Sequence, residues 1–482
     1  MLRALSVVAI SGGAAVCIGK IVLDRIHHSV GIAPPTEQQL EEEDQEEHAL
    51  FRHLPTLRRR LAWRQLGHFP TPIHRGIIGS DKNTTFYVKR EDLSSGAYGG
   101  NKVRTLQHQL AVCESKNPAS NIYVCGSGGS NQVVATVVHG FSRLKLRNIL
   151  PVYVTADVPD LDNTMNMLSV LSFALPEPIV TWGAMSSVVS ALWKAINPLS
   201  DSFILPPGGN NPSGVLGQIS GMLELAEQVL SGEVSDPNHI FLAVGSSCTI
   251  TGLIIGTALA KHLNLPVFEN LTIHGVPIHD GIVKANKNIN FSRSTWSSYF
   301  PMSIRHSIRS TCSTLVELGG PDLDAKAMYI FEHNVVIHNA TDIVGKYGGH
   351  SVLSREAASR YDSHGKVFDA SGNETRPLWL CGHFTSKAFA VMMEKAEKWK
   401  ETKGVFLFWQ TKSAVQPLGT ADEWGKLKIM PGKIKAWANK GKAESSLRVG
   451  RVNVDTGDKE DYRHLMTRVD NVDAKHGSRA SM

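Results

Sequence analysis

The chain has 482 residues, 42% of them hydrophobic and 20% charged, as in an ordinary globular protein of two or three domains. Its formal net charge of +6 is small for this length, and the basic residues form no stripes interleaved with aromatic ones, which disfavours nucleic-acid binding. The six cysteines lack CxxC spacing and no histidine pair has zinc-ligand spacing, so we expect reduced thiols and no metal site.

The N-terminal segment is hydrophobic. Residues 4–19, ALSVVAISGGAAVCIG, carry no charge between Arg3 and Lys20, and they are fewer than the roughly 20 residues that a membrane span needs. A signal anchor, a mitochondrial leader and a cleaved signal peptide all fit this pattern. We predict a leader or membrane anchor over residues 1–26, with membrane attachment through residues 4–23; a mitochondrial or cytoplasmic location also stays open.

Three polar segments flank the remaining chain. The acidic run EEEDQEEH, residues 41–48, predicts a solvated linker over residues 27–49. The run LRRRLAWR, residues 57–64, predicts a short basic helix face that is either solvated or in contact with a membrane surface. Residues 431–482 are polar and basic with little periodicity, so we expect a mobile C-terminal tail.

From residue 67 to residue 419 the sequence alternates short apolar runs with helical patterns, which is typical of an α/β fold. Strands are predicted at residues 121–126, 150–156, 239–245, 271–278 and 404–411. Several of these runs end in glycine or a hydroxyl residue, and ligands gather at such ends in open α/β sheets.

The segment GGNKVRTLQHQLA contains the first candidate functional residue. Gly99 and Gly100 permit a tight turn, Asn101 can cap a helix, and Lys102 then lies near the helix N-terminus. The positive end of the helix dipole and partial burial would disfavour the ammonium form, which makes the amine a better nucleophile toward an aldehyde. A surface lysine after a turn would give the same pattern.

Two further segments place glycines before a predicted helix. CGSGGSNQVVATVVHG, residues 125–140, offers backbone N–H groups and the side chains of Ser130 and Asn131 to an anion, although an ordinary N-cap also fits. LPPGGNNPSGVLGQISG, residues 205–221, has closely spaced glycines that could form a backbone wall over a planar ligand or a domain-crossing loop.

The fourth segment, FLAVGSSCTITGLIIGTAL, is a buried strand, a turn and an apolar helix at residues 241–259. Backbone N–H groups and hydroxyls converge at this helix N-terminus, as expected for binding a phosphate monoester. The chain has neither a GxxxxGK[ST] loop nor a GxGxxG turn, which disfavours ATP and NAD. A single phosphate, one activated lysine and no metal motif together describe pyridoxal 5′-phosphate (PLP).

Six motifs in this order resemble the D-cysteine desulfhydrase and 1-aminocyclopropane-1-carboxylate (ACC) deaminase family: FPTPIHR, VKREDL, GGNKVR, GSGGSNQ, PPGGNNPSGVLG and the loop Gly245–Thr249. This family belongs to the tryptophan-synthase-β-like PLP enzymes of fold type II. The resemblance covers roughly residues 65–420 and implies a homodimer with two open twisted-sheet domains. We expect the larger domain at residues 50–102 and 216–430, the smaller at 103–215, and PLP in the cleft between them.

The resemblance also implies a role for each matching residue. Lys102 would form a Schiff base with the cofactor and exchange the proton at the substrate α-carbon, and Ser130 would face the substrate carboxylate or act near that carbon. Asn131 would hydrogen-bond the cofactor's 3′-oxygen, and Thr411 would lie near the pyridine nitrogen. The phosphate would be held by Gly245, Ser246, Ser247, Cys248 and Thr249.

The chain departs from the family in two motifs. Phe384, in CGHFTSK, stands where the family's DPVYTGK has a tyrosine, and Tyr347, in YGGHS, is a candidate catalytic substitute for the missing hydroxyl. Ser247 and Cys248 replace glycines of the family's GSGGT loop, which suggests a repositioned loop. Residues 280–345 are longer and less like the family, and their pattern predicts no role.

The sequence therefore predicts a PLP-dependent lyase or deaminase acting on a small amino acid. A D-cysteine desulfhydrase-like β-elimination, which yields a keto acid, ammonia and sulfide, fits the resemblance best. A racemase or dehydratase that uses the same carbanion is an alternative within enzymes. A catalytically lapsed, membrane-tethered PLP-binding protein is the alternative from another class.

Overall fold

The structure is a computed structural model that describes residues 29–43, 48–79, 84–155, 159, 161–175, 179–180, 202–278, 303–338, 343, 348–382, 384–398, 404–430, 432–440, 451–453 and 459–460. The predicted leader at residues 1–26 and Tyr347 lie outside these ranges. Within them, no helix is both long and apolar enough to cross a membrane.

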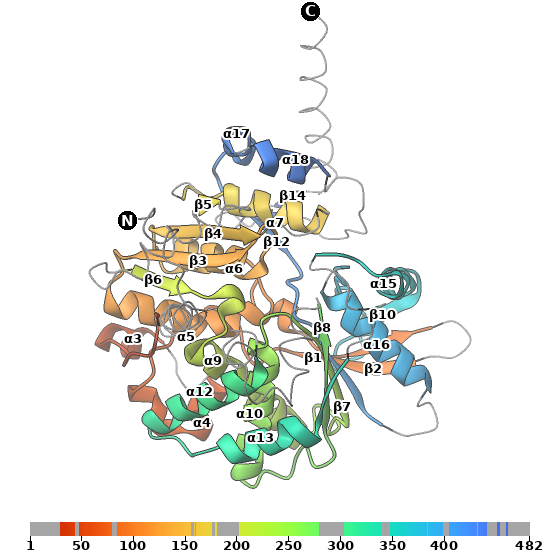
Figure 1. Ribbon diagram of the computed structural model, residues 1–482. Helices are drawn as coiled ribbons and strands as arrows, with labels where there is room; N and C mark the ends of the chain where they lie inside the picture. Colours follow the sequence, from red (N-terminus) through yellow and green to blue (C-terminus); the bar gives the residue numbers. More distant parts are fainter. Residues whose placement is uncertain are drawn as a thin grey trace, which may run out of the picture.

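A seven-stranded mixed sheet has the order β10-β1-β2-β11-β7-β8-β9 and lies in the lower right of Figure 1. The four strands from β11 to β9 and the strand β2 beside them run parallel, whereas β1 pairs antiparallel with both β2 and β10. The strands span Ile73–Ile78 (β1), Thr84–Lys89 (β2), His239–Val244 (β7), Thr272–Pro277 (β8), Val335–Ile337 (β9), Gly365–Phe368 (β10) and Phe406–Trp409 (β11).

A four-stranded sheet, β5-β4-β3-β6, lies above it in Figure 1, and all its strands are parallel. It consists of β3 (Asn121–Ser127), β4 (Ile149–Thr155), β5 (Ile179–Val180) and β6 (Ser202–Leu205). A small third sheet combines β12 (Gln416–Leu418), β13 (Arg451–Asn453) and β14 (Lys459–Glu460). The strands predicted from apolar runs are all present, within one or two residues of their expected limits.

Helices cover both faces of the seven-stranded sheet. Side chains alternate between the faces of a strand, so Ile240 and Leu242 of β7 join one apolar cluster with α9 and α10, while Phe241 joins another with α16. The described helices are α3 (Glu37–Glu42), α4 (Ala49–His53), η2 (Pro55–Arg59), η3 (Glu91–Leu93), α5 (Asn101–Lys116), α6 (Asn131–Val137), η4 (Val138–Arg143), α7 (Leu161–Leu171), η5 (Pro207–Gly209), α9 (Pro212–Leu230), α10 (Cys248–His262), α12 (Ile304–Glu317), α13 (Asp324–His333), α15 (Val352–His364), α16 (Thr385–Lys398), α17 (Glu423–Ile429) and α18 (Gly432–Lys440).

Helix α9 packs against both α5 and α10 and so connects the candidate lysine helix with the candidate phosphate helix. The approach to α5 is close: a Cβ on Gly217 would lie 2.0 Å from the carbonyl oxygen of Arg104. A residue without a side chain is therefore required at this position. The short distance fixes the start of α5 relative to α9.

Three polar segments differ from their predictions. In the expected linker, α3 is capped by Thr36 and buries Gln39, whose amide donates to the carbonyl oxygen of Ala111 at 3.1 Å. The expected tail contains α18, whose Ile434 and Trp437 are buried in the apolar cluster around α5. Composition misled in both places because a few apolar or amide anchors are enough to dock a mostly polar helix.

The predicted basic face at residues 57–64 is solvated at Arg59 and Arg60, but the rest of the run differs from expectation. Its first part is the 3₁₀ turn η2, and Leu57 and Trp63 are buried. Arg64 is buried too and makes ion pairs with Glu42 and Glu114, both at 2.7 Å. The run anchors the N-terminal part of the chain through apolar side chains and one buried arginine.

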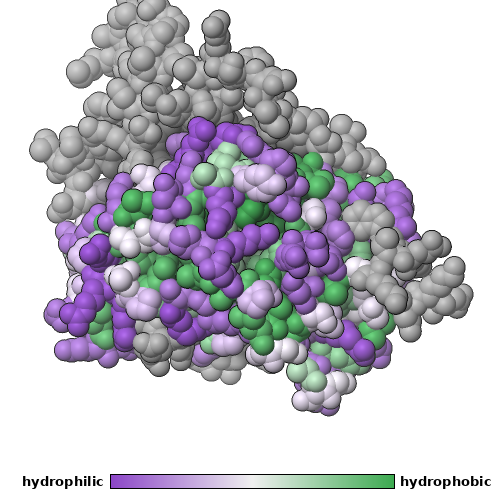
Figure 2. Space-filling model, turned by 90° about the horizontal axis from the view of Figure 1, so that it is seen from below, coloured by the Kyte–Doolittle hydropathy of each residue, from purple (hydrophilic) through white to green (hydrophobic). Residues whose placement is uncertain are grey.

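Figure 2 shows hydrophilic side chains over much of the described surface seen from below, with hydrophobic ones between them.

Candidate active site

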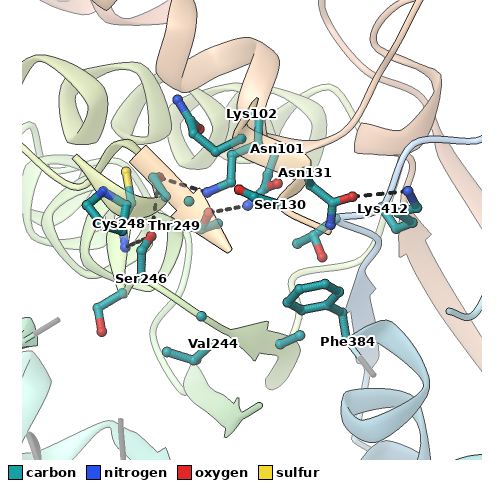
Figure 3. A pocket seen from close by; sticks show the side chains of 18 of the residues that line it. Asn101, Lys102, Ser130, Asn131, Val244, Ser246, Cys248, Thr249, Phe384 and Lys412 are labelled. Carbon is teal, nitrogen blue, oxygen red and sulfur yellow. Dashed lines mark hydrogen bonds between the residues drawn. The ribbon is translucent and has the colours of Figure 1, made fainter. Parts of the chain in front are cut away.

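A cavity of about 360 Å³ lies where the start of α5, the end of β3, the loop before α9 and the turn between β7 and α10 meet. This volume is within the usual range for a small-molecule site. The cavity is lined by Asn101, Lys102, Gly126, Ser127, Ser130, Asn131, Gln132, Pro207, Gly208, Ala243, Val244, Gly245, Ser246, Ser247, Cys248, Thr249, Ile250, Phe384, Thr411 and Lys412. The four glycine- or hydroxyl-rich segments thus all contribute to one pocket (Figure 3).

Lys102 is the second residue of α5 and projects into this pocket. Its Nζ donates a hydrogen bond to the carbonyl oxygen of Gly208 at 2.8 Å. Burial lowers the pKa of Lys102 below its ordinary value, and the nearby Cys248 thiol opposes this shift. The carbonyl oxygen accepts a hydrogen bond from the amine but carries no full negative charge. Deprotonation of Lys102 therefore costs less free energy than deprotonation of a lysine that is paired with a carboxylate.

Asn101 has a different role from the predicted helix cap. The cap position is Gly100, at a φ of 99°, and Asn101 is the first helical residue. Its side-chain amide donates to Thr249 Oγ1 at 2.8 Å, which links the start of α5 to the start of α10. The lysine and the candidate phosphate loop are therefore held together by a direct hydrogen bond.

The turn Gly245–Thr249 leads from β7 into α10 and lines one end of the pocket. Ser247 has a φ of 70°, the left-handed conformation that a glycine adopts without strain, and it immediately precedes α10. The first N–H groups of a helix have no partners within the helix and carry its positive dipole end. The turn therefore precedes a helix N-terminus, which is the position of a candidate anion site, with serine and cysteine where the family has glycines.

The chain also brings Ser130 and Asn131 to the pocket. Ser130 caps α6, since its Oγ accepts a hydrogen bond from the N–H of Val133 at 3.4 Å. Gly126, the second-last residue of β3, lies so close to this cap that a Cβ there would be 2.6 Å from Ser130 Oγ. Asn131 Oδ1 accepts hydrogen bonds from three neighbouring side chains, so its Nδ2 is the donor left for a ligand.

The region beyond β11 contributes both a predicted and an unpredicted residue. Thr411 lines the pocket as expected, and its carbonyl oxygen accepts from the N–H of Asn101 at 3.2 Å. Lys412, the next residue, is buried and lines the pocket as well, with its Nζ 3.0 Å from Asn131 Oδ1. No local pattern indicates Lys412 as a site residue, because only the fold brings residues 131 and 412 together.

A second feature missed in the sequence is the set of buried charges beneath α5. Arg104 donates to both oxygens of Glu91, at 2.7 and 2.8 Å, and to Glu224 at 2.8 Å. Glu224 also pairs with Lys89, and all four side chains are almost completely buried. Burial raises the pKa of Glu224, but Arg104 and Lys89 outweigh it and lower that pKa to about 2. The motif VKREDL thus supplies structural charges beneath Lys102.

The residues present fit PLP. Lys102 would supply an amine for its aldehyde, the α10 turn would supply donors for its phosphate, and the Asn131 amide leaves one donor for a ligand. Ser127 Oγ is buried and has no hydrogen-bond partner among the described residues, so the pocket retains polar capacity for a ligand. Phe384 faces the same space and offers no hydroxyl (Figure 3). None of the described residues form a cluster of metal-ligating side chains.

Comparison with known proteins shows the family and the cofactor. The family profile described as "Pyridoxal-phosphate dependent enzyme" matches residues 64–308. The bifunctional D-cysteine desulfhydrase/ACC deaminase of Arabidopsis thaliana, a mitochondrial protein, is 29% identical over 205 residues, which are 40% of this chain and 50% of that protein. The D-cysteine desulfhydrase of Salmonella paratyphi C is 28% identical over 201 residues, 39% of this chain and 57% of that protein.

Among solved structures, the crystal structure of an ACC deaminase homologue superposes with a TM-score of 0.51 at 19% sequence identity. The superposition covers 76% of this chain and 94% of that one. The predicted resemblance, the fold class and the PLP cofactor are thereby confirmed. The chain matches only about half the length of the two curated relatives described above, so their activities are not carried over with the fold.

Proposed function

The chain belongs to the family of pyridoxal-phosphate-dependent enzymes, and we propose that it is a lyase or deaminase of a small amino acid, with D-cysteine desulfhydrase-like β-elimination as its reaction. The observation that carries the proposal is the position of Lys102. Its amine lies in a cavity of about 360 Å³, with its pKa lowered by burial, opposite an anion-binding turn on α10. The two curated relatives with this activity in their names support the choice of reaction.

Bound PLP supplies an electron sink for the bond pair released when an α-proton leaves. Lys102 would hold the cofactor's aldehyde carbon and, once displaced by the substrate amine, accept the α-proton on Nζ. Ser130 at the start of α6 would orient the substrate carboxylate, and the turn before α10 would hold the phosphate. Sulfide would leave from the β-carbon, and the remaining fragment would hydrolyse to a keto acid and ammonia.

Phe384 favours a second candidate, a protein that binds PLP without turnover. Its ring lines the pocket where the related family has a tyrosine, so it can neither donate nor accept a proton at the substrate. Tyr347, the proposed substitute, lies outside the described residues. A reaction that needs only Lys102 as base, such as β-elimination of a good leaving group, tolerates this loss better than ring opening of ACC does.

The two candidates are separated by a product assay on the purified PLP-bound protein. D-cysteine, L-cysteine, D-serine and ACC are offered in turn, and sulfide, keto acid, ammonia and the mirror-image amino acid are measured. We expect sulfide and keto acid in equal amounts from D-cysteine, and none from the Lys102→Ala variant. Keto acid from serine alone would identify a dehydratase, and mirror-image product would identify a racemase.

If no product forms with any substrate, the Phe384→Tyr variant decides the interpretation. Restored turnover in that variant would assign the inactivity to the missing phenol. A variant that binds PLP and stays inactive would contradict the lyase proposal and support a PLP-binding protein without catalysis.

A further inference from the structure

Lys412 is a second buried lysine at the pocket, and its side-chain contacts include three oxygen atoms and two aromatic faces. Its Nζ donates to Asn131 Oδ1 at 3.0 Å and to Tyr98 Oη and Asn166 Oδ1, both at 3.3 Å. The ring of Trp379 lies 4.4 Å from Nζ at its centroid, and the Tyr98 ring 5.4 Å. The side chain is 3% exposed.

This arrangement matches an ammonium ion. Three oxygens accept from Nζ, and a charged lysine has three N–H donors where a neutral amine has two. Tyr98 Oη donates its proton to Asn131 Oδ1 at 2.8 Å. It therefore has no proton left to donate to Lys412, and in the bond between them Lys412 is the donor. An aromatic face at cation–π distance further favours the charged form.

The same contacts fix the orientation of Asn131. Its Oδ1 accepts from Lys412 at 3.0 Å, from Tyr98 at 2.8 Å and from Asn166 Nδ2 at 3.0 Å. Asn166 is itself held by Gln416, whose Nε2 donates to Asn166 Oδ1 at 2.9 Å. With the oxygen directed at this cluster, the Asn131 Nδ2 is turned to the pocket, as Figure 3 shows.

We propose that Lys412 is a positioning residue for the cofactor: its ammonium locks the Asn131 amide with Nδ2 toward the cofactor's ring oxygen and, through its positive charge, keeps that oxygen anionic. The inference rests on PLP binding at Lys102. It concerns a lysine that directly follows Thr411 and that neither the family resemblance nor the predicted site assigned to the pocket.

Two titratable groups close to Lys412, Tyr98 and Cys381, do not carry a positive charge. Burial raises the pKa of Tyr98 well above its ordinary value and that of Cys381 to about 11, so both are neutral near pH 7. Asp162 on α7 raises the pKa of both groups, and Lys102 lies across the pocket on α5. Removing the Lys412 charge therefore removes a positive charge that neither Tyr98 nor Cys381 replaces.

The test is a pH titration of the visible absorbance of the bound cofactor, without substrate. A positive charge beside the ring oxygen disfavours further protonation of the bound cofactor. One charge a few ångströms away, at an effective dielectric constant of about 20, shifts a titration by about two to three pH units. The Lys412→Gln variant, which keeps hydrogen-bonding capacity but no charge, should therefore raise the pH midpoint of the spectral change by at least about one unit. The Lys412→Arg variant keeps the positive charge, so its midpoint should lie closer to the wild-type value than that of Lys412→Gln.

The matched control is Lys387→Met, which removes another fully buried lysine, one whose Nζ donates to the Ile278 carbonyl oxygen at 3.0 Å and which does not line the pocket. Its spectral midpoint should stay at the wild-type value. An unchanged midpoint in folded Lys412→Gln would overturn the proposal, and so would an equal shift in the Lys387→Met control. If Lys412→Gln does not fold, Lys412→Met is titrated under the same criteria. Because no substrate is used, these outcomes do not depend on whether the proposed β-elimination is correct.

Discussion

Replacing Arg104 by methionine should strongly destabilise the protein, although Arg104 does not line the pocket. The arginine is 1% exposed and makes three short hydrogen bonds to Glu91 and Glu224. Without it, two buried carboxylates share one cation, Lys89. Breaking a buried ion pair by removing one partner typically costs about 3–5 kcal/mol, and we expect a loss of unfolding free energy of this size.

The assay is urea unfolding of the PLP-bound protein, followed by tryptophan fluorescence, with Arg360→Met as the matched control. Arg360 pairs with Glu397 at the surface, where the two side chains are 45% and 40% exposed. Exposed pairs contribute about 0–1 kcal/mol, so the control should unfold almost like the wild type. Equal midpoints for Arg104→Met and Arg360→Met would refute the argument that the buried charges support the start of α5.

Two further predictions concern titration and labelling. The pKa of Glu224 is lowered from 4.5 to about 2, which corresponds to roughly 3 kcal/mol of stability from the ionised carboxylate. This stability should be complete above pH 4.5 and lost as the pH falls through 2. A Glu224→Gln variant should lack this part of the acid-unfolding curve. Borohydride reduction of the wild type should attach the pyridoxyl group to the peptide that contains Lys102, and Lys102→Ala should stay folded without that label; a label on Lys89 or Lys412 would contradict the site assignment.

The fold was largely predictable because its strands are continuous apolar runs. β3, β7 and β11 are buried on both faces, which produces β-branched and aromatic runs bounded by glycine or polar residues. The N-terminal and C-terminal segments were not predictable in the same way. Gln39 anchors α3, and Ile434 and Trp437 anchor α18, in mostly polar sequence; one or two buried anchors give a periodic pattern too short to predict a docked helix.

The site was predictable where its residues lie in glycine-rich turns. Lys102, Ser130 and the turn Gly245–Thr249 follow strands or open helices, and local sequence alone indicates a ligand there. Lys412 and the buried charges were missed because their partners are distant in the sequence: Lys412 contacts Asn131, and Lys89 contacts Glu224. These contacts form only in the folded protein, and the local sequence around each residue does not indicate them.

Three buried or partly buried lysines show why only one is suited to be the nucleophile. Lys89 is ion-paired with Glu224, so loss of its proton would leave this buried carboxylate with Arg104 as its one remaining described ion-pair partner. Lys412 donates to three side-chain oxygens, so loss of its proton would leave one buried acceptor without its donor. Lys102 donates to one carbonyl oxygen, that of Gly208, and a neutral amine can still make this bond. Deprotonation therefore costs least at Lys102, and the same amine is the one that faces the turn on α10.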